Sequence, residues 1–237
     1  MPLTIEIFGF EGCPHLDAAR EVVQAVAQDL RIDATPKAVL LGSDEEARQA
    51  GFLGSPTIRV NGRDLERRDG PAVGLTCRLY EGGTGVPPRW MVEAAVLNAL
   101  APRGILFLCV QNSARSPMAE GIARRLARSN VEVFSAGSSP ATVNPLAIEA
   151  LAEIGVDISG HRSKAVSEVP ADRVEAVITL CAEEVCPTFL GGARRVHWGL
   201  PDPARVPGTR EARLQAFREV RDELLRRLTL LFDPVRE

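Results

Sequence analysis

Residues 104–110, GILFLCV, form a nearly all-apolar run that leads directly into a polar loop. A run of this length and composition is typical of a parallel strand that is buried on both faces. Beyond the loop, apolar residues recur at helical spacing. The sequence therefore predicts a central strand, a turn that begins at a cysteine, and a helix.

Strands and helices alternate on both sides of residues 101–104. In the first half we expect elements at residues 3–8, 16–30, 37–42, 55–66 and 90–100, with a hairpin turn at Asn61-Gly62. In the second half we expect them at residues 104–110, 131–137, 144–154, 173–181, 194–199 and 211–231. This alternation predicts an α/β protein of two domains, residues 1–100 and 104–237, the second with a parallel sheet and flanking helices.

Composition excludes several classes of function. The net charge of -3 does not favour a nucleic acid partner, and no apolar stretch has the length of a bilayer helix. The first ten residues do not resemble a signal peptide, so we expect a cytoplasmic protein that contacts no membrane.

In a reducing compartment, cysteines are more often catalytic or redox-active than paired in structural disulfides. The chain has five: Cys13, Cys77, Cys109, Cys181 and Cys186.

The loop after the apolar run carries the strongest chemical signal. Successive backbone amides in such a loop can surround a tetrahedral oxyanion, and the following helix adds its positive N-terminal end. Arg115 can bind two oxygens at once, and a Ser116 hydroxyl directed at the Cys109 sulfur would favour the thiolate that attacks. We therefore predict an oxyanion-binding nucleophile site formed by Cys109, Val110, Gln111, Asn112, Ser113, Ala114 and Arg115.

Several segments extend this signal over the whole second half, in order: FLCVQNSARSPMAEG, VFSAG, NPLAIEALAEIGVDISGHRSK, VITLCAEEVCP and HWGLPDPA. This half resembles the thioredoxin-coupled arsenate reductases, which share the low-molecular-weight tyrosine phosphatase fold. The resemblance implies that the chain binds arsenate and other small oxyanions, reduces arsenate to arsenite in arsenic detoxification, and needs no cofactor or catalytic metal.

The resemblance also implies roles for individual residues. Asp202, which precedes Pro203, corresponds to the general acid of the family. Cys109 attacks arsenate, Cys181 attacks Cys109 so that arsenite leaves, and Cys186 attacks Cys181, which leaves a Cys181–Cys186 disulfide. Thioredoxin, glutaredoxin or a low-molecular-weight thiol then restores the two thiols.

Two other functions are compatible with parts of this pattern. A phosphatase for phosphotyrosine or small phosphoesters needs Cys109, Arg115 and Asp202, but it has no use for Cys181 and Cys186. A thiol protein that binds arsenite or a soft metal is chemically reasonable, although it leaves Arg115 and Asp202 without a role. A structural zinc site is disfavoured because Cys181 and Cys186 lack the usual ligand spacing.

The resemblance further implies a monovalent cation site in some members. The matching residues are Asn112, Glu120, Ser135 and an aspartate that follows the residue equivalent to Ser163. Here Lys164 takes the place of that aspartate. Its ammonium group can replace the ion, or Lys164 can be an ordinary solvated lysine.

The first half combines Gly12-Cys13-Pro14-His15-Leu16 at a helix start with Ser55-Pro56-Thr57 before a hairpin. This half resembles a thioredoxin/glutaredoxin-like domain, in which Pro56 matches the cis-proline beside the active thiol. Leu16 replaces the second cysteine of the usual Cys-Pro-x-Cys motif. Cys77 or an external thiol can therefore resolve a mixed disulfide on Cys13, so that this half acts as a fused reductant; alternatively, the half serves only as a docking or dimerisation module.

Overall fold

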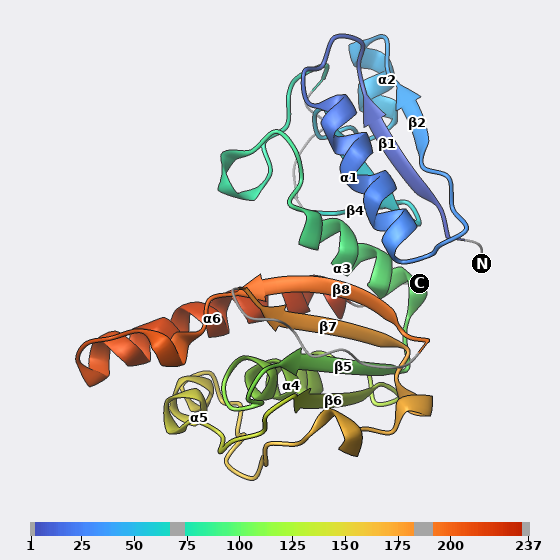
Figure 1. The fold of residues 1–237 in the computed structure, drawn as a ribbon. Coiled ribbons are helices and arrows are strands. Elements are labelled where there is room, and N and C mark those ends of the chain that lie inside the picture. Colours follow the sequence, from blue (N-terminus) through green and yellow to red (C-terminus); the bar gives the residue numbers. More distant parts are fainter. Residues whose placement is uncertain (1–2, 67–73, 183–191, 234–237) are drawn as a thin grey trace. The chain divides into compact units, whose positions relative to one another are not determined.

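The computed structural model describes residues 3–66, 74–182 and 192–233. The chain divides into two compact units, Met1–Leu100 and Ala101–Glu237. Both units combine helices with a sheet (Figure 1), which confirms the predicted α/β class. None of the described helices is long and apolar enough to cross a membrane.

The first unit has a mixed four-stranded sheet in the order β2-β1-β3-β4. Strand β1 pairs in parallel with β2 and antiparallel with β3, which in turn pairs antiparallel with β4. The elements are β1 (Ile5–Gly9), α1 (Leu16–Asp29), β2 (Lys37–Leu40), α2 (Asp44–Gln49), β3 (Thr57–Val60), β4 (Arg63–Asp64), a 3₁₀ turn η1 (Glu81–Gly83) and α3 (Arg89–Leu100).

Local chemistry explains where these elements begin and turn. The Ser43 hydroxyl accepts a hydrogen bond from the Glu46 amide and so caps α2. Asn61 and Gly62 both have positive φ, the conformation that a tight hairpin between β3 and β4 requires. The β-α-β unit followed by a β-hairpin and a helix therefore places the start of α1 and the start of β3 at the same end of the sheet.

The second unit has a wholly parallel sheet in the order β6-β5-β7-β8. Its strands and helices are β5 (Gly104–Cys109), α4 (Arg115–Leu126), β6 (Glu132–Gly137), α5 (Pro145–Ala152), β7 (Ala176–Cys181), β8 (Arg194–Leu200) and α6 (Arg210–Leu231). Three 3₁₀ turns complete it: η2 (Val166–Glu168), η3 (Ala171–Arg173) and η4 (Pro203–Arg205).

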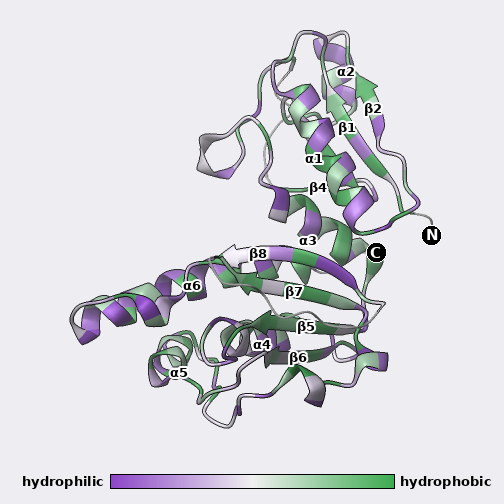
Figure 2. Cartoon of the chain, viewed as in Figure 1, coloured by the Kyte–Doolittle hydropathy of each residue, from purple (hydrophilic) through white to green (hydrophobic). Residues whose placement is uncertain are grey.

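The central position of β5 explains its composition. All six of its residues are buried, because β6 and β7 flank it and both faces are covered. Leu106 and Leu108 pack into a cluster with Val177 on one face, while α4 packs against β5 and β6 and contacts α5 and α6. Figure 2 shows hydrophobic residues along β5 and many hydrophilic ones along α6. The polar loop that follows β5 consequently emerges at the carboxyl edge of the sheet.

Candidate functional site

The loop between β5 and α4 lines a cavity of about 260 Å³. Cys109 ends β5 and is 2% exposed, and Arg115 begins α4 and is 3% exposed. The cavity residues are Cys109, Val110, Gln111, Ser113, Ala114, Arg115, Asp202, Ala204 and Arg205. The structure thus brings the predicted nucleophile, guanidinium and acid to one concave site.

The carbonyl groups of the loop are held by donors from outside it. Val110 accepts from the Ser139 amide at 2.9 Å, Gln111 from Ala141 at 3.0 Å and Ser113 from Asn144 at 2.8 Å. The carbonyl of Asn112 accepts from the Ser163 hydroxyl at 2.6 Å. Since C=O and N–H point in opposite directions across a peptide unit, carbonyls bonded on the outside favour amides that face the cavity. This arrangement suits a tetrahedral oxyanion.

Two backbone positions allow the loop to pack this closely. Asn112 has a positive φ of 47°, a conformation that asparagine tolerates better than most residues. Gly137, at the end of β6, lies so close to the loop that a Cβ there would be 2.4 Å from the Val110 carbonyl oxygen and 2.7 Å from the Asn112 nitrogen. Both contacts involve backbone atoms, so only glycine fits at this position.

The Cys109 sulfur has a hydroxyl partner. The Ser116 oxygen lies 2.9 Å from it. That oxygen also accepts a hydrogen bond of 2.9 Å from the Asn112 side-chain nitrogen, which donates to Ser135 as well. Because an amide nitrogen donates and does not accept, the hydroxyl hydrogen of Ser116 remains available for the sulfur. Asn112 and Ser116 therefore orient a hydroxyl donor toward the Cys109 sulfur.

Arg115 and Asp202 meet in the cavity. Nη2 of Arg115 lies 3.2 Å from Oδ2 of Asp202, and Nη1 donates to the Leu200 carbonyl at 3.1 Å. Asp202 also accepts from the Ala204 amide at 3.1 Å, which anchors the carboxyl at the start of η4. The guanidinium is thus held by the Leu200 carbonyl and has a carboxyl group beside it.

The sequence did not lead us to expect Arg205 in the site. It lines the same cavity as Cys109, and its Nε lies 3.8 Å from Oδ2 of Asp202. A spacing of three residues places Asp202 and Arg205 on one side of the 3₁₀ turn η4. That spacing within Asp-Pro-Ala-Arg is the signal that could have revealed it. Arg205 adds a second, more exposed positive charge at the cavity.

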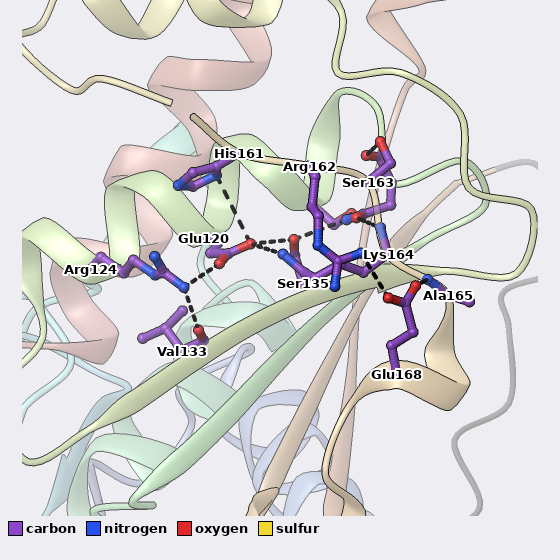
Figure 3. A network of polar contacts seen from close by, with 12 residues as sticks. Glu120, Arg124, Val133, Ser135, His161, Arg162, Ser163, Lys164, Ala165 and Glu168 are labelled. Atoms are coloured by element: carbon purple, nitrogen blue, oxygen red, sulfur yellow. Dashed lines mark hydrogen bonds and ion pairs between the residues drawn. The ribbon is translucent and has the colours of Figure 1, made fainter. Parts of the chain in front are cut away.

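The residues of the predicted cation position form one polar network (Figure 3). Glu120, on α4, is 1% exposed, and its carboxylate accepts hydrogen bonds from Ser135 and, at 3.1 Å, from the Lys164 ammonium. Arg124 lies 2.5 Å from the other carboxylate oxygen. The Lys164 backbone amide also donates to the Asn112 side chain at 2.7 Å. Lys164 therefore contacts both the buried acid and the anion loop.

His161 borders this network. Its Nδ1 lies 4.0 Å from the Glu120 carboxylate. Burial lowers the pKa of His161; Arg124 and Lys164 act in the same direction, against Glu120, which raises it. Burial therefore favours the neutral imidazole, and Lys164 and Arg124 supply the positive charge that lies against the Glu120 carboxylate.

The first of the two predicted relay cysteines, Cys181, ends a strand beside the site. Cys181 ends β7, is 1% exposed and pairs in register with Leu200, whose carbonyl accepts from Arg115. Cys109, at the end of β5, is a free thiol. Cys186 lies outside the described residues. Among the described residues, no group of three or more His, Cys, Asp or Glu side chains is arranged to hold a metal ion.

The first unit brings its predicted redox residues together. Cys13 is half-buried, and its thiol lies 3.7 Å from the Ser55 carbonyl oxygen. The Ser55–Pro56 peptide bond is cis. Cys77 is exposed, and its backbone forms an isolated β-bridge with Ser55.

Comparison with known proteins concerns the second unit. Residues 104–237, more than half of the chain, match the family model described as low molecular weight phosphotyrosine protein phosphatase. Over 126 residues the chain is 43% identical to an arsenate reductase of Halalkalibacterium halodurans and 41% identical to one of Bacillus subtilis; each alignment covers 52% of this chain and 91% of the relative. A solved arsenate reductase from Archaeoglobus fulgidus is similar at 28% identity with a TM-score of 0.48, over 55% of this chain and 99% of that one. From its match to the family model, the chain belongs to the low molecular weight phosphotyrosine protein phosphatase family.

Proposed function

We propose that the chain reduces arsenate to arsenite, with Cys109 as nucleophile. The observation that carries this proposal is that Cys109 lies in a loop that suits a tetrahedral oxyanion, while a second cysteine, Cys181, ends the adjacent strand β7. A hydrolase would need only the loop, the arginine and the acid, whereas a reductase needs electrons as well. The two relatives named above, which match this half, are arsenate reductases.

In the proposed relay, the Cys109 thiolate bonds to arsenic and a hydroxyl group leaves as water, with a proton from Asp202. The Cys181 thiolate then attacks the Cys109 sulfur. The sulfur–arsenic bond breaks and its electron pair stays on arsenic, which leaves as arsenite. Cys186 attacks Cys181 and frees Cys109, so that the two electrons come from the Cys181–Cys186 pair.

Mass spectrometry of the reduced chain, treated with arsenate without added reductant, tests this relay. We expect a Cys181–Cys186 disulfide and at least one arsenite per chain. The Cys181→Ser variant should form no such disulfide and release no arsenite. Hydrolysis of a small aryl phosphate without formation of this disulfide would instead support the phosphatase alternative, and arsenite bound to unoxidised thiols would support a binding protein.

We further propose that the first unit serves as a fused reductant for this disulfide. Covalent linkage raises the effective concentration of one thiol site at another, on the order of millimolar for short flexible linkers. An external thioredoxin, glutaredoxin or low-molecular-weight thiol then restores the first unit, in a reducing compartment such as the cytoplasm. Electron counting tests this role: a fully reduced chain should release a second arsenite, and Cys13→Ser should release only the first.

The Lys164 ammonium, in this proposal, takes the place of a monovalent cation beside Glu120. We expect turnover to change less than twofold, roughly, when potassium chloride replaces sodium chloride at equal ionic strength. Lys164→Gln leaves the buried Glu120 carboxylate with one cation fewer, and it should lower the free energy of unfolding by roughly 1–3 kcal/mol.

Denaturant titration measures that loss, with Lys37→Gln as a matched control, since Lys37 is exposed at the start of β2 in the other unit. Strong stimulation of the parent protein by potassium, with no effect of sodium, would show that an ion and not Lys164 supplies the charge.

A further inference from the structure

The first unit lacks the second cysteine of a Cys-x-x-Cys motif, and the structure shows what replaces it. Leu16 occupies that position and is 8% exposed. Its side chain packs against Gly9, where an added Cβ would lie 2.7 Å from a Leu16 methyl group. Because leucine has no thiol, this buried residue cannot resolve a mixed disulfide on Cys13. Residues 1–100 contain one thiol besides Cys13, namely Cys77, which is 64 positions further along the chain.

Both cysteines lie against the same residue, Ser55. The Cys13 thiol is directed at the Ser55 carbonyl oxygen at 3.7 Å. The Ser55 amide donates to the Thr76 carbonyl at 2.8 Å, and the Arg78 amide donates to the Ser55 carbonyl at 2.9 Å. These two bonds bracket Cys77, so its backbone lies beside Ser55 in a parallel bridge. The bridge therefore brings the two cysteines together.

Arg78 holds this bridge in place. Its guanidinium is buried and donates to both oxygens of Asp64, at 2.7 Å each, and to Thr57 at 3.2 Å. It also lies 4.5 Å from the centre of the Tyr80 ring, whose hydroxyl donates to the Pro56 carbonyl at 2.9 Å. Cys77 is thus exposed, while Arg78 and Tyr80 in the same segment are buried and fix its backbone. Such a thiol is accessible and keeps its position relative to Cys13.

The two sulfur atoms interact electrostatically. Desolvation raises the pKa of the Cys77 thiol, and the charge of Cys13 and a hydrogen bond to Cys13 raise it further. A raised pKa keeps Cys77 in its thiol form while Cys13 reacts. This order suits a second thiol, which acts only after the first has formed a mixed disulfide.

We propose that Cys13 and Cys77 together form a dithiol–disulfide exchange site, with Cys13 as the attacking thiol and Cys77 as the resolving one. The substrate class is a disulfide, from a protein or a small molecule. Cys13 bonds to one substrate sulfur and the other leaves as a thiol. Cys77 then bonds to the Cys13 sulfur and the second substrate sulfur leaves, so that the substrate gains two electrons and two protons while a Cys13–Cys77 disulfide forms. This site does not depend on arsenate reduction.

Thiol trapping in the full chain tests the proposal. In a Cys109→Ser, Cys181→Ser, Cys186→Ser background, only Cys13 and Cys77 remain. After equilibration with mixtures of reduced and oxidised glutathione and rapid alkylation, we expect both thiols to disappear together. The intact mass should fall by two hydrogen atoms, and digestion should yield one cross-linked Cys13–Cys77 peptide pair.

Three further variants in this background separate pairing from independent reactivity. Adding Cys77→Ser should leave a glutathione adduct on Cys13, and adding Cys13→Ser should prevent any internal disulfide. A matched control combines Cys77→Ser with Leu79→Cys, which places a thiol at an exposed position of the same segment away from the bridge; it should lose the internal disulfide. Separate glutathione adducts on Cys13 and Cys77, without a cross-linked peptide, would overturn the proposal, whatever the outcome for arsenate.

Discussion

The Cys109→Ser variant should lose arsenate reduction, with a fall in kcat/KM of roughly 10³-fold or more, as expected when a covalent nucleophile is removed. A serine hydroxyl ionises far less readily than a thiol, and it cannot form the disulfide that releases arsenite. The oxyanion loop itself should survive, because its carbonyl groups are held by Ser139, Ala141, Asn144 and Ser163 and not by the sulfur.

Arsenite release and phosphate binding, measured on the same preparation, separate these effects. Phosphate should still bind to Cys109→Ser with an affinity close to that of the parent. Thr229→Ser serves as a control, because Thr229 is an exposed residue of α6 outside the cavity lining, and this variant should keep turnover. Undiminished arsenate reduction by Cys109→Ser would contradict the whole assignment of the site.

The second large effect is expected from Arg115→Lys, for which kcat/KM should fall roughly 10²- to 10³-fold. The charge is retained, but an ammonium group cannot bind two oxygens in one plane. It also cannot reproduce the paired contacts that Arg115 makes with Asp202 and with the Leu200 carbonyl. The loss should therefore come from geometry and not from net charge.

Steady-state kinetics of arsenate reduction and calorimetric titration of phosphate measure this effect. Arg125→Lys is the matched control, since Arg125 lies on the same helix α4 but is exposed and donates to the Ile154 carbonyl. It should leave kcat/KM within about twofold of the parent, as is usual for an exposed substitution away from the site. Equal activity of Arg115→Lys and the parent would mean that Arg115 does not bind the oxyanion.

The oxyanion loop could be predicted because its signals are local. An apolar strand, a loop that begins at Cys109 and a helix that begins at Arg115 occupy consecutive positions, and β5 is buried as its composition indicates. Contacts that depend on tertiary packing could not be predicted from the sequence, because no local pattern signals them. The close approach of Gly137 to Val110 joins the ends of two neighbouring strands, and no local pattern distinguishes this glycine from one in a turn.

The same limit applies to Lys164 and Cys77. From the sequence, an ordinary solvated lysine was as reasonable as an ion replacement, because the contact with Glu120 joins positions 44 residues apart. Cys77 could be named only as one of several thiols able to resolve Cys13. Its position beside Ser55 depends on the bridge that Arg78 anchors, and a buried arginine outside a regular strand has no periodic signature.

A ring of amides and a guanidinium distinguish tetrahedral anions by shape and charge, and arsenate shares both with phosphate. The loop therefore cannot provide selectivity at the capture step, and phosphate should act as a competitive inhibitor. Discrimination arises afterwards, because a sulfur–arsenic bond can return its electrons to arsenic while phosphorus has no accessible lower state under these conditions. In such an enzyme the redox chemistry of the substrate, and not the fit of the pocket, decides which anion is converted.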